Sequence, residues 1–428
     1  MKILILSQYF PPEIGAVPVR LAAVANELRN RGHFVEVVTA LPNHPHGRIA
    51  PEYTGSWLRS ESWEGIPVHR VRVHASTGAG LGRMINYASF ACMALAGLIR
   101  ARRPDFIFVE SPPPTVAIPA IIAARIWRAR VIVNIADLWP DSISALKLSG
   151  NRILIQALGI LERWIYRNAD FVTAITLGVK NTIESVKGVP AERVLYLPNG
   201  VDTSLFHPMP PDNRLRAELG LPEHVFLYAG TLGYAHGLET LINAAHLLRD
   251  RLDAHFLFIG DGSERSRLER MKAEMALANV TFHDAVPARE LARYASFATA
   301  AIVPQRDIPL FRANRPAKLF AMMGCGKPVV FCGHGEAATL VESARSGIVV
   351  PPENSAALAQ ALRDLLDHPA EVASTGANGR RFVESQYSWR ALIDKWLAEL
   401  ESRAGAVTLH AQPTKSKVSA ACETAPEI

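Results

Sequence analysis

The chain has 428 residues, which is too long for one ordinary hydrophobic core and predicts two domains of about 200 residues each. With 49% hydrophobic and 20% charged residues, its composition is that of a soluble globular protein. The net charge of +6 suits phosphate ligands or an anionic membrane face, although a solubilising surface is the commoner cause of such an excess. It is too weak to indicate nucleic acid, and we find no RNA- or DNA-binding motif.

The first half of the chain alternates apolar strands with helical stretches. A helix is expected over residues 17–31, ending at Gly32, and a long loop over 41–57. Alternation of this kind implies parallel βαβ units, so residues 1–205 are predicted to form a doubly wound domain. The strands expected in it cover residues 3–6, 34–40, 105–110, 129–137, 169–176 and 193–202.

The pattern restarts after the proline-rich connection 207–213 and predicts a second βαβ domain over residues 206–385. An amphipathic helix over 386–403 is expected to pack back towards the first domain, and residues 404–428 are expected to be a disordered tail. Two domains of this kind place a ligand cleft between them, at the carboxyl ends of their strands. The strands expected in the second domain cover residues 225–230, 255–262, 280–286, 300–304, 328–333 and 347–352.

The cysteines show no metal-ligand spacing, and Cys325 and Cys332 flank a strand that is expected to be buried, where they would fill the core. This usage points to a reducing compartment. The apolar run at the N-terminus is too short for a secretory signal and is interpreted as the first strand. We therefore expect a cytoplasmic protein, acting at the inner face of the cell membrane if it contacts lipid.

One segment hints at such a contact. Residues 84–99 carry no charge, but these sixteen residues fall short of the roughly 20 that span a bilayer. A buried helix of the α/β domain is the favoured interpretation. The alternative is a peripheral membrane contact of the first domain, with flanking arginines on anionic head groups. The flanking residues are Arg83, Arg100, Arg102 and Arg103.

Three features of the second half suit a diphosphate. The segments GTLGYAHGLETL (230–241) and IGDGSE (259–264) are glycine-rich loops that follow strands, where backbone N–H groups approach a phosphate closely. The segment PAKLFAMMGCGKPVV (316–330) predicts a helix with Lys318 in its first turn, where the helix dipole already favours an anion. Each feature alone is common, but together they indicate a nucleotide-diphosphate site.

Taken together, the chain resembles the retaining glycosyltransferases of the GT-B class, family 4, and within them the WbuB/WcaI-like sugar transferases of surface polysaccharide assembly. The resemblance implies an α/β fold of the GT-B type, with two doubly wound, Rossmann-like domains facing a central cleft. The matching segments run in family order over about residues 1–400: YFPPEIGAVPVR (9–20), PNHPHGRIAPEYTG (42–55), ADLWPDS (136–142), LPNGVD (197–202), GTLGYAHGLETL (230–241), GDG (260–262) and PAKLFAMMGCGKPVV (316–330).

The resemblance also implies the reaction. A sugar would pass from a nucleotide-diphosphate donor, with a UDP-sugar favoured, to a polyprenol-linked or oligosaccharide acceptor in surface polysaccharide or lipopolysaccharide synthesis. The leaving phosphate would accept the acceptor's proton in a front-face displacement, with no cofactor and no metal. We find no DxD-type carboxylate pair.

Roles for individual residues follow from the same resemblance. Lys318 would hold the diphosphate, Gly15 would let the backbone approach the reacting sugar, and Asp137 would face the acceptor, although Asp137 serves equally well as a helix cap. Arg306 and Arg315 are candidate helpers of Lys318, with a free surface arginine the alternative for both. Glu239 is interpreted as a solvated helix residue. Donor-side residues would be Gly230, Thr231, Gly233, His236, Gly260, Gly262, Arg306, Lys318 and Ala321. Acceptor-side residues would be Asn43, His44, His46, Asp137 and Trp139.

The chain departs from the family at two positions. Family 4 carries glutamates where this chain has Ala313 and Ala321, and losing a charge-assisted contact to the donor ribose would cost about 1.5–3 kcal/mol of binding. Two alternatives therefore stay open. One is a degenerate GT-B protein that binds a nucleotide or partner without turnover. The other is a GT-B nucleotide-sugar epimerase or hydrolase, which would need acid–base groups such as Glu13, Asp137 or Asp141.

Overall fold

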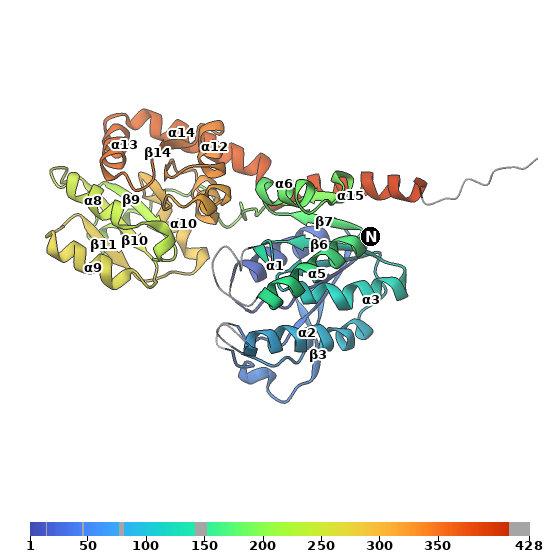
Figure 1. The fold of residues 1–428 in the computed structure, drawn as a ribbon. Coiled ribbons are helices and arrows are strands. Elements are labelled where there is room, and N and C mark those ends of the chain that lie inside the picture. The colour runs from blue at the N-terminus through green and yellow to red at the C-terminus, as the bar shows by residue number, and fades with distance from the viewer. Residues whose placement is uncertain (14, 45–46, 77–80, 142–151, 411–428) are drawn as a thin grey trace, which may run out of the picture.

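The computed structural model describes residues 1–410 except 14, 45–46, 77–80 and 142–151, and in it the chain forms two α/β domains, each built on its own sheet (Figure 1). The first sheet has the strand order β3-β4-β2-β1-β5-β6-β7-β8 and is parallel except that β3 runs antiparallel to β4. Its strands are β1 (Lys2–Leu6), β2 (Phe34–Ala40), β3 (Leu58–Trp63), β4 (Ile66–Val71), β5 (Phe106–Ser111), β6 (Arg130–Ile135), β7 (Phe171–Ala174) and β8 (Val194–Tyr196).

Helices cover both faces of the first sheet, because parallel strands are buried on both sides. One layer packs on the core around Val38, Val109 and Val133, and the other on the core around Ile5, Val37 and Phe108. The first layer consists of α2 (Leu81–Arg100), α3 (Ala117–Trp127), α5 (Arg152–Asn168) and α6 (Leu177–Ser185). The second consists of α1 (Ala16–Asn30) and the last helix, α15 (Trp389–His410).

The hairpin β3–β4 was not expected from the sequence, which predicted helical stretches after the loop at 41–57. The turn at Glu64 and Gly65 has positive φ at both residues, 48° and 82°, which is the geometry of a tight hairpin. The glycine at the turn was the available signal. The hairpin adds an edge to the sheet beside β2.

The second sheet is wholly parallel, in the order β11-β10-β9-β12-β13-β14. Its strands are β9 (His224–Ala229), β10 (Ala254–Ile259), β11 (Val280–His283), β12 (Ala300–Pro304), β13 (Val329–Cys332) and β14 (Gly347–Val350). Cys325 and Cys332 are buried in the cores of this domain, as their place beside a buried strand predicts. The helices are α7 (Asn213–Glu218), α8 (Glu239–Leu247), α9 (Arg265–Glu274), α10 (Ala288–Ser296), α11 (Ala317–Gly324), α12 (Glu336–Ser343), α13 (Ser355–Asp367) and α14 (Pro369–Gln386).

The chain returns to the first domain at its end. Trp396 of α15 is fully buried, with its ring 5.8 Å from that of Phe108, and its indole N–H donates to the hydroxyl of Thr173. Arg31 at the end of α1 pairs with Asp394 at 2.7 Å. The helix extends beyond Arg403 to His410, so the expectation of a disordered tail from residue 404 is wrong for 404–410. Residues 411–428 lie outside the described part of the chain.

The carboxyl ends of the two sheets face each other. Helix α6 starts just after β7, and its Gly178 N–H donates to the Glu336 carboxylate of the second domain at 3.1 Å. Arg315 bridges the domains as well, since it donates to the hydroxyl of Tyr196 and pairs with Glu336 at 2.6 Å. Because α11 follows Arg315 directly, its first turn lies on the side of the second domain that faces the first.

Candidate functional site

Lys318 lies in the first turn of α11, as the sequence predicts. Its Nζ donates to the hydroxyl of Tyr228 at 2.7 Å and lies 4.2 Å from the centre of that ring. Burial lowers the pKa of Lys318 to about 7, because a low-dielectric surrounding disfavours the ammonium form. An anion bound beside the Lys318 amine would stabilise its protonated form. Lys318 is therefore a candidate ligand for a phosphate.

Tyr228 is a candidate site residue that the sequence analysis missed. It ends the apolar part of β9, is buried, and its hydroxyl donates to the Thr231 carbonyl at 2.6 Å while accepting from Lys318. His236 lies with its ring 6.1 Å from that of Tyr228, and burial together with Lys318 lowers its pKa to about 4. His236 is therefore neutral at neutral pH and offers one ring N–H at most as a donor. The available signal for Tyr228 was its place immediately before the glycine loop.

Two glycine loops form a backbone cradle around Lys318. A Cβ added at Gly230 would lie 3.1 Å from the Lys318 Nζ, so a larger residue would press on the ammonium group. A Cβ at Gly260 would collide with the carbonyl oxygen of Gly230, and one at Gly262 with that of Leu232. The loops are joined by hydrogen bonds from Gly230 to Ile259 at 2.9 Å and from Leu232 to Asp261 at 2.8 Å. Glycine is required here because the two backbones touch.

The outer part of the first glycine loop closes the cradle. Thr231 is exposed, and Gly233 precedes the short 3₁₀ helix Tyr234–His236. The N–H of Arg306 donates to Ala235 at 3.1 Å, which fixes this loop onto the segment that follows β12. The predicted donor-side residues of the loops and Lys318 therefore converge at the carboxyl ends of β9, β10 and β12.

Arg306 is not available for a diphosphate in this structure. Its guanidinium pairs with Glu239 at 2.5 Å and with Glu353 at 2.7 Å, and it donates to the Tyr234 carbonyl. In this structure Arg306 therefore holds the loop against α8, and its assistance to Lys318 stays a prediction. Glu239 is likewise no solvated helix residue, since it also pairs with Arg267 at 3.0 Å.

The two alanines occupy different environments. Ala321 is one helical turn after Lys318 and is buried among apolar side chains. Ala313 ends the 3₁₀ helix Pro309–Ala313 and faces the first domain, where a Cβ at Gly178 would lie 3.3 Å from its own. Arg315, expected as a surface arginine, is instead buried between the domains, with Glu336, Tyr196 and Tyr387 around it. Glu336, whose carboxylate lies beside Gly178 as Ala313 does, is thus bound to a cation.

The loops predicted to lie on the acceptor side are organised around Glu13. Its buried carboxylate accepts the backbone N–H groups of Asn43 and His44, both at 2.9 Å, and burial raises its pKa. The ring of Tyr9 lies 5.4 Å from that of His44. Glu13 therefore joins the loop after β1 to the loop after β2. The predicted residue His46 lies outside the described residues.

A buried polar network fixes α1 below this loop. Arg20 of α1 donates to the side chain of Asn134 at 2.9 Å, and Asn134 donates to Glu110 at 2.9 Å. Burial raises the pKa of Glu110 to about 7. Gly15 is the N-cap residue of α1. The network therefore fixes the position of the Gly15 backbone, which the family resemblance predicts to lie near the reacting sugar.

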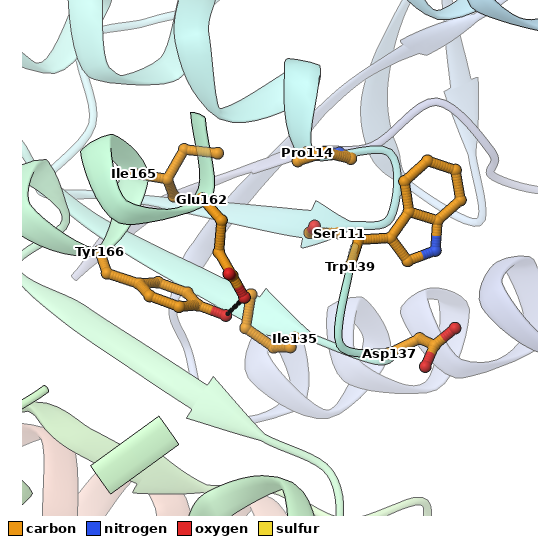
Figure 2. A pocket seen from close by; sticks show the side chains of 8 residues that line it. All are labelled: Ser111, Pro114, Ile135, Asp137, Trp139, Glu162, Ile165 and Tyr166. Carbon is orange, nitrogen blue, oxygen red and sulfur yellow. Dashed lines mark hydrogen bonds between the residues drawn. The ribbon is translucent and has the colours of Figure 1, made fainter. Parts of the chain in front are cut away.

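Asp137 and Trp139 follow β6 and line a narrow pocket of the first domain. In Figure 2 both side chains point away from Tyr166 and Glu162, which are joined by a hydrogen bond of 3.0 Å. The Trp139 ring lies 6.0 Å from that of Tyr87 on α2, a second aromatic residue that the sequence did not single out. The pocket is completed by Ser111, Pro114, Ile135 and Ile165.

Two of the three carboxylates named for an epimerase, Asp141 and Glu13, have structural partners, whereas the third, Asp137, lines the pocket of the first domain. Lys187 pairs with Asp141 at 2.8 Å and with Glu162 at 2.9 Å, and Glu13 accepts backbone N–H groups. Across the described residues there is no group of three or more His, Cys, Asp or Glu side chains that would hold a metal ion. The candidate site therefore consists of Lys318 and the two glycine loops in the second domain, and of polar and aromatic side chains on the loops of the first domain.

Solved structures share this architecture. Sucrose-phosphate synthase from Thermosynechococcus elongatus superposes with a TM-score of 0.69 at 20% identity, covering 95% of this chain and 99% of that one. Anabaena HepE, solved in complex with UDP, superposes with a TM-score of 0.68 at 20% identity, covering 94% of this chain and all of that one. The two α/β domains have the fold of the GT-B class of glycosyltransferases.

The sequence comparisons define the family within that class. The profile described as "Glycosyl transferase 4-like domain" matches residues 15–200, and that described as "Glycosyl transferases group 1" matches 223–368. WcaI of Escherichia coli, a glycosyl transferase assigned to colanic acid biosynthesis, is 31% identical over 304 residues, which are 67% of this chain and 74% of WcaI. The chain belongs to glycosyltransferase family 4. A GDP-mannose-dependent phosphatidylinositol monomannoside mannosyltransferase of Mycolicibacterium smegmatis is 28% identical, covering 81% of this chain and 94% of the relative.

Proposed function

We propose that this glycosyltransferase moves a sugar from a nucleotide-diphosphate donor in the second domain to a lipid-linked saccharide held by the first. The observation that carries the proposal is the Lys318 cradle. It brings together the enclosed amine of Lys318, the N-terminus of α11 and two glycine loops. A diphosphate bound there would be stabilised as it leaves and its negative charge increases. The product would enter surface polysaccharide or lipopolysaccharide synthesis, as the colanic acid assignment of WcaI favours.

The chemistry needs few groups. Breaking the bond between the anomeric carbon and the diphosphate develops negative charge on the leaving oxygen, which a protonated Lys318 and the α11 N–H groups would stabilise. Glu13 and Asp141 are held by structural partners, which favours a mechanism in which the leaving phosphate itself takes the acceptor's proton. Such a front-face displacement retains the anomeric configuration and requires no metal.

The donor we favour is a UDP-sugar, since the fold matches that of HepE with bound UDP. GDP-mannose is the competing donor, because the mannosyltransferase relative is named for it. The name of the same relative includes phosphatidylinositol monomannoside, a glycolipid, and this favours a lipid-linked acceptor for the present chain. Asn43, His44, Asp137 and Trp139 would contact that acceptor.

A second candidate function is nucleotide binding without turnover. Ala313 and Ala321 favour it, because neither position offers a carboxylate and the adjacent Glu336 is bound to Arg315. The two functions differ in one observable, since a degenerate protein would bind the nucleotide and form no product.

A transfer assay separates them. The protein is incubated with radiolabelled UDP-, GDP-, ADP- and dTDP-sugars, a chelator, and lipid-linked saccharides extracted from the source cells. We expect label from one donor to enter the lipid fraction, with the anomeric configuration of the donor preserved in the product by NMR. Nucleotide binding with no labelled lipid from any donor would favour the degenerate protein, and an inverted product would contradict the proposed displacement.

A further inference from the structure

The solvent side of α2 is apolar along its whole length. The residues that face outward recur at helical spacing and include no charged residue between Arg83 and Arg100, whereas a surface helix ordinarily carries polar residues there. Ile99 is 81% exposed. The stripe consists of Met84, Ile85, Ala88, Cys92, Leu95 and Ile99.

The neighbouring helices continue this surface. Helix α2 packs beside α3, and α3 beside α5, in one layer over the sheet, as Figure 1 shows. Ile126 of α3 is 74% exposed and Ile160 of α5 is 61% exposed. Among the described residues, eight of the 17 exposed large hydrophobic side chains lie on these three helices, and such a concentration of exposed apolar side chains indicates an interaction site. We call the outer side of α2, α3 and α5 the isoleucine face.

The charge of the isoleucine face has one sign. Glu162 is the only acidic residue of α2, α3 and α5 in the described chain, and it is buried against Lys187 and Tyr166. Each helix ends in exposed arginines at the same edge, because all three run antiparallel to the strands that follow them. These are Arg100 and Arg103 after α2, Arg128 after α3, and Arg163 and Arg167 on α5. Arg103 and Arg128 also line a groove at this edge, together with Lys2, Trp127 and the acidic Asp105.

The isoleucine face adjoins the acceptor side of the site. Tyr87 points inward from α2 and contacts Trp139, while Met84 and Ile85, less than one turn away, point outward. A surface lying on α2 would therefore meet the mouth of the cleft at the N-terminal end of that helix. By length and composition, Gly82–Arg100 would also cross a membrane, with a mean hydropathy of 1.2. Its inner side packs on β2, β4 and α3, however, so in the folded domain it lies along the surface.

We propose that the isoleucine face docks on an anionic lipid bilayer, with the isoleucines in the interface and the arginines on lipid phosphates. The edge of this apolar stripe carries more exposed arginines than carboxylates, the exposed acidic residues there being Asp105 and Asp170, and such an excess of positive charge matches a negatively charged membrane. Membrane docking itself does not require transferase activity. The role we give to docking, which is to bring a lipid-linked acceptor to the site, rests on the proposed function. In that role α2 lies along the membrane and its first turns hold Tyr87 at the point where the acceptor enters.

The test is co-sedimentation of the full chain with vesicles, without donor or acceptor. We expect the protein to pellet with vesicles of phosphatidylglycerol and phosphatidylcholine in equal parts, to stay in solution with phosphatidylcholine alone, and to be released by salt. The double substitution Leu95→Glu with Ile99→Glu should weaken binding at least about tenfold. Replacing Arg100 and Arg103 by alanine should weaken it roughly fivefold for each arginine.

Matched controls lie on the second domain. Leu252→Glu changes a side chain that is 89% exposed, and replacing Arg270 and Arg289 by alanine removes two exposed arginines there. Both controls should bind vesicles like the unmodified protein, and all variants should keep its thermal unfolding midpoint. Absence of vesicle binding, or equal losses in the controls, overturns the inference. It is also overturned if the double variant Leu95→Glu, Ile99→Glu converts a dimer into a monomer with vesicle binding unchanged, since the face is then a subunit interface. Transfer to a soluble saccharide in the absence of vesicle binding would leave the proposed function standing and reject only the docking surface.

Discussion

Replacing Lys318 by alanine is expected to lower kcat/KM for the nucleotide-sugar donor about a thousandfold, because the leaving diphosphate loses its enclosed cation. The fold should survive, since the residue is at the start of α11 and has the Tyr228 hydroxyl as its hydrogen-bond partner. The rate is measured as nucleoside diphosphate release once the donor is known, with thermal unfolding as the check on folding.

Lys327 provides the matched control. It is also a buried lysine, it donates to the Ser296 carbonyl at 2.7 Å, and it lies just before β13, at the opposite edge of the sheet from Lys318. Lys327→Ala should reduce thermal stability and leave kcat/KM almost unchanged. Equal activity of the Lys318→Ala and unmodified proteins would remove Lys318 from the mechanism.

Affinity for the nucleotide sugar should fall as the pH rises above about 7. The diphosphate favours protonated Lys318, and with a pKa of about 7 in the free protein this amine must take up a proton to bind above that pH. The association constant should therefore be nearly constant below about pH 6 and fall about tenfold for each pH unit above 7. His236, with its pKa lowered to about 4, does not titrate in this window. Calorimetric titration of a nucleotide sugar between about pH 6 and 9 measures the profile.

The Lys318→Arg variant is the control for that profile. A guanidinium stays charged throughout this range, so its affinity should not depend on pH even if it is weaker. A flat profile for the unmodified protein would mean that Lys318 does not face the diphosphate, or that its amine is charged throughout.

The sequence predicted the fold well because hydrophobic runs of parallel strands are long and bounded by turn residues. Residues 34–40 and 300–304 form strands with the expected bounds, and the helix carrying Lys318 begins one residue after Pro316. The β3–β4 hairpin was missed because β3 is mostly polar and partly exposed, while Pro67, His69 and Arg70 interrupt the apolar residues of the buried strand β4.

The site was predicted less completely, for a physical reason. The glycine loops and the helix start at Lys318 are visible in short sequence motifs, because their geometry depends on neighbouring residues. Ion pairs join residues far apart in the chain, so no short motif reveals them. Arg306 looked like a free cation because its partners Glu239 and Glu353 are 67 and 47 residues away. Tyr228 was hidden for the same reason, since only the folded sheet brings it under Lys318, 90 residues later.

Nucleotide binding by the second domain is the central claim, and a thermal-shift panel with UDP, GDP, ADP and dTDP tests it most directly. A nucleotide at about a hundred times its dissociation constant adds roughly 2.7 kcal/mol to the free energy of unfolding. We predict that one base stands out and that its shift largely disappears in the Lys318→Ala variant. No shift with any of the four nucleotides, or a shift that Lys318→Ala leaves intact, would contradict the assignment of the cradle as the donor site.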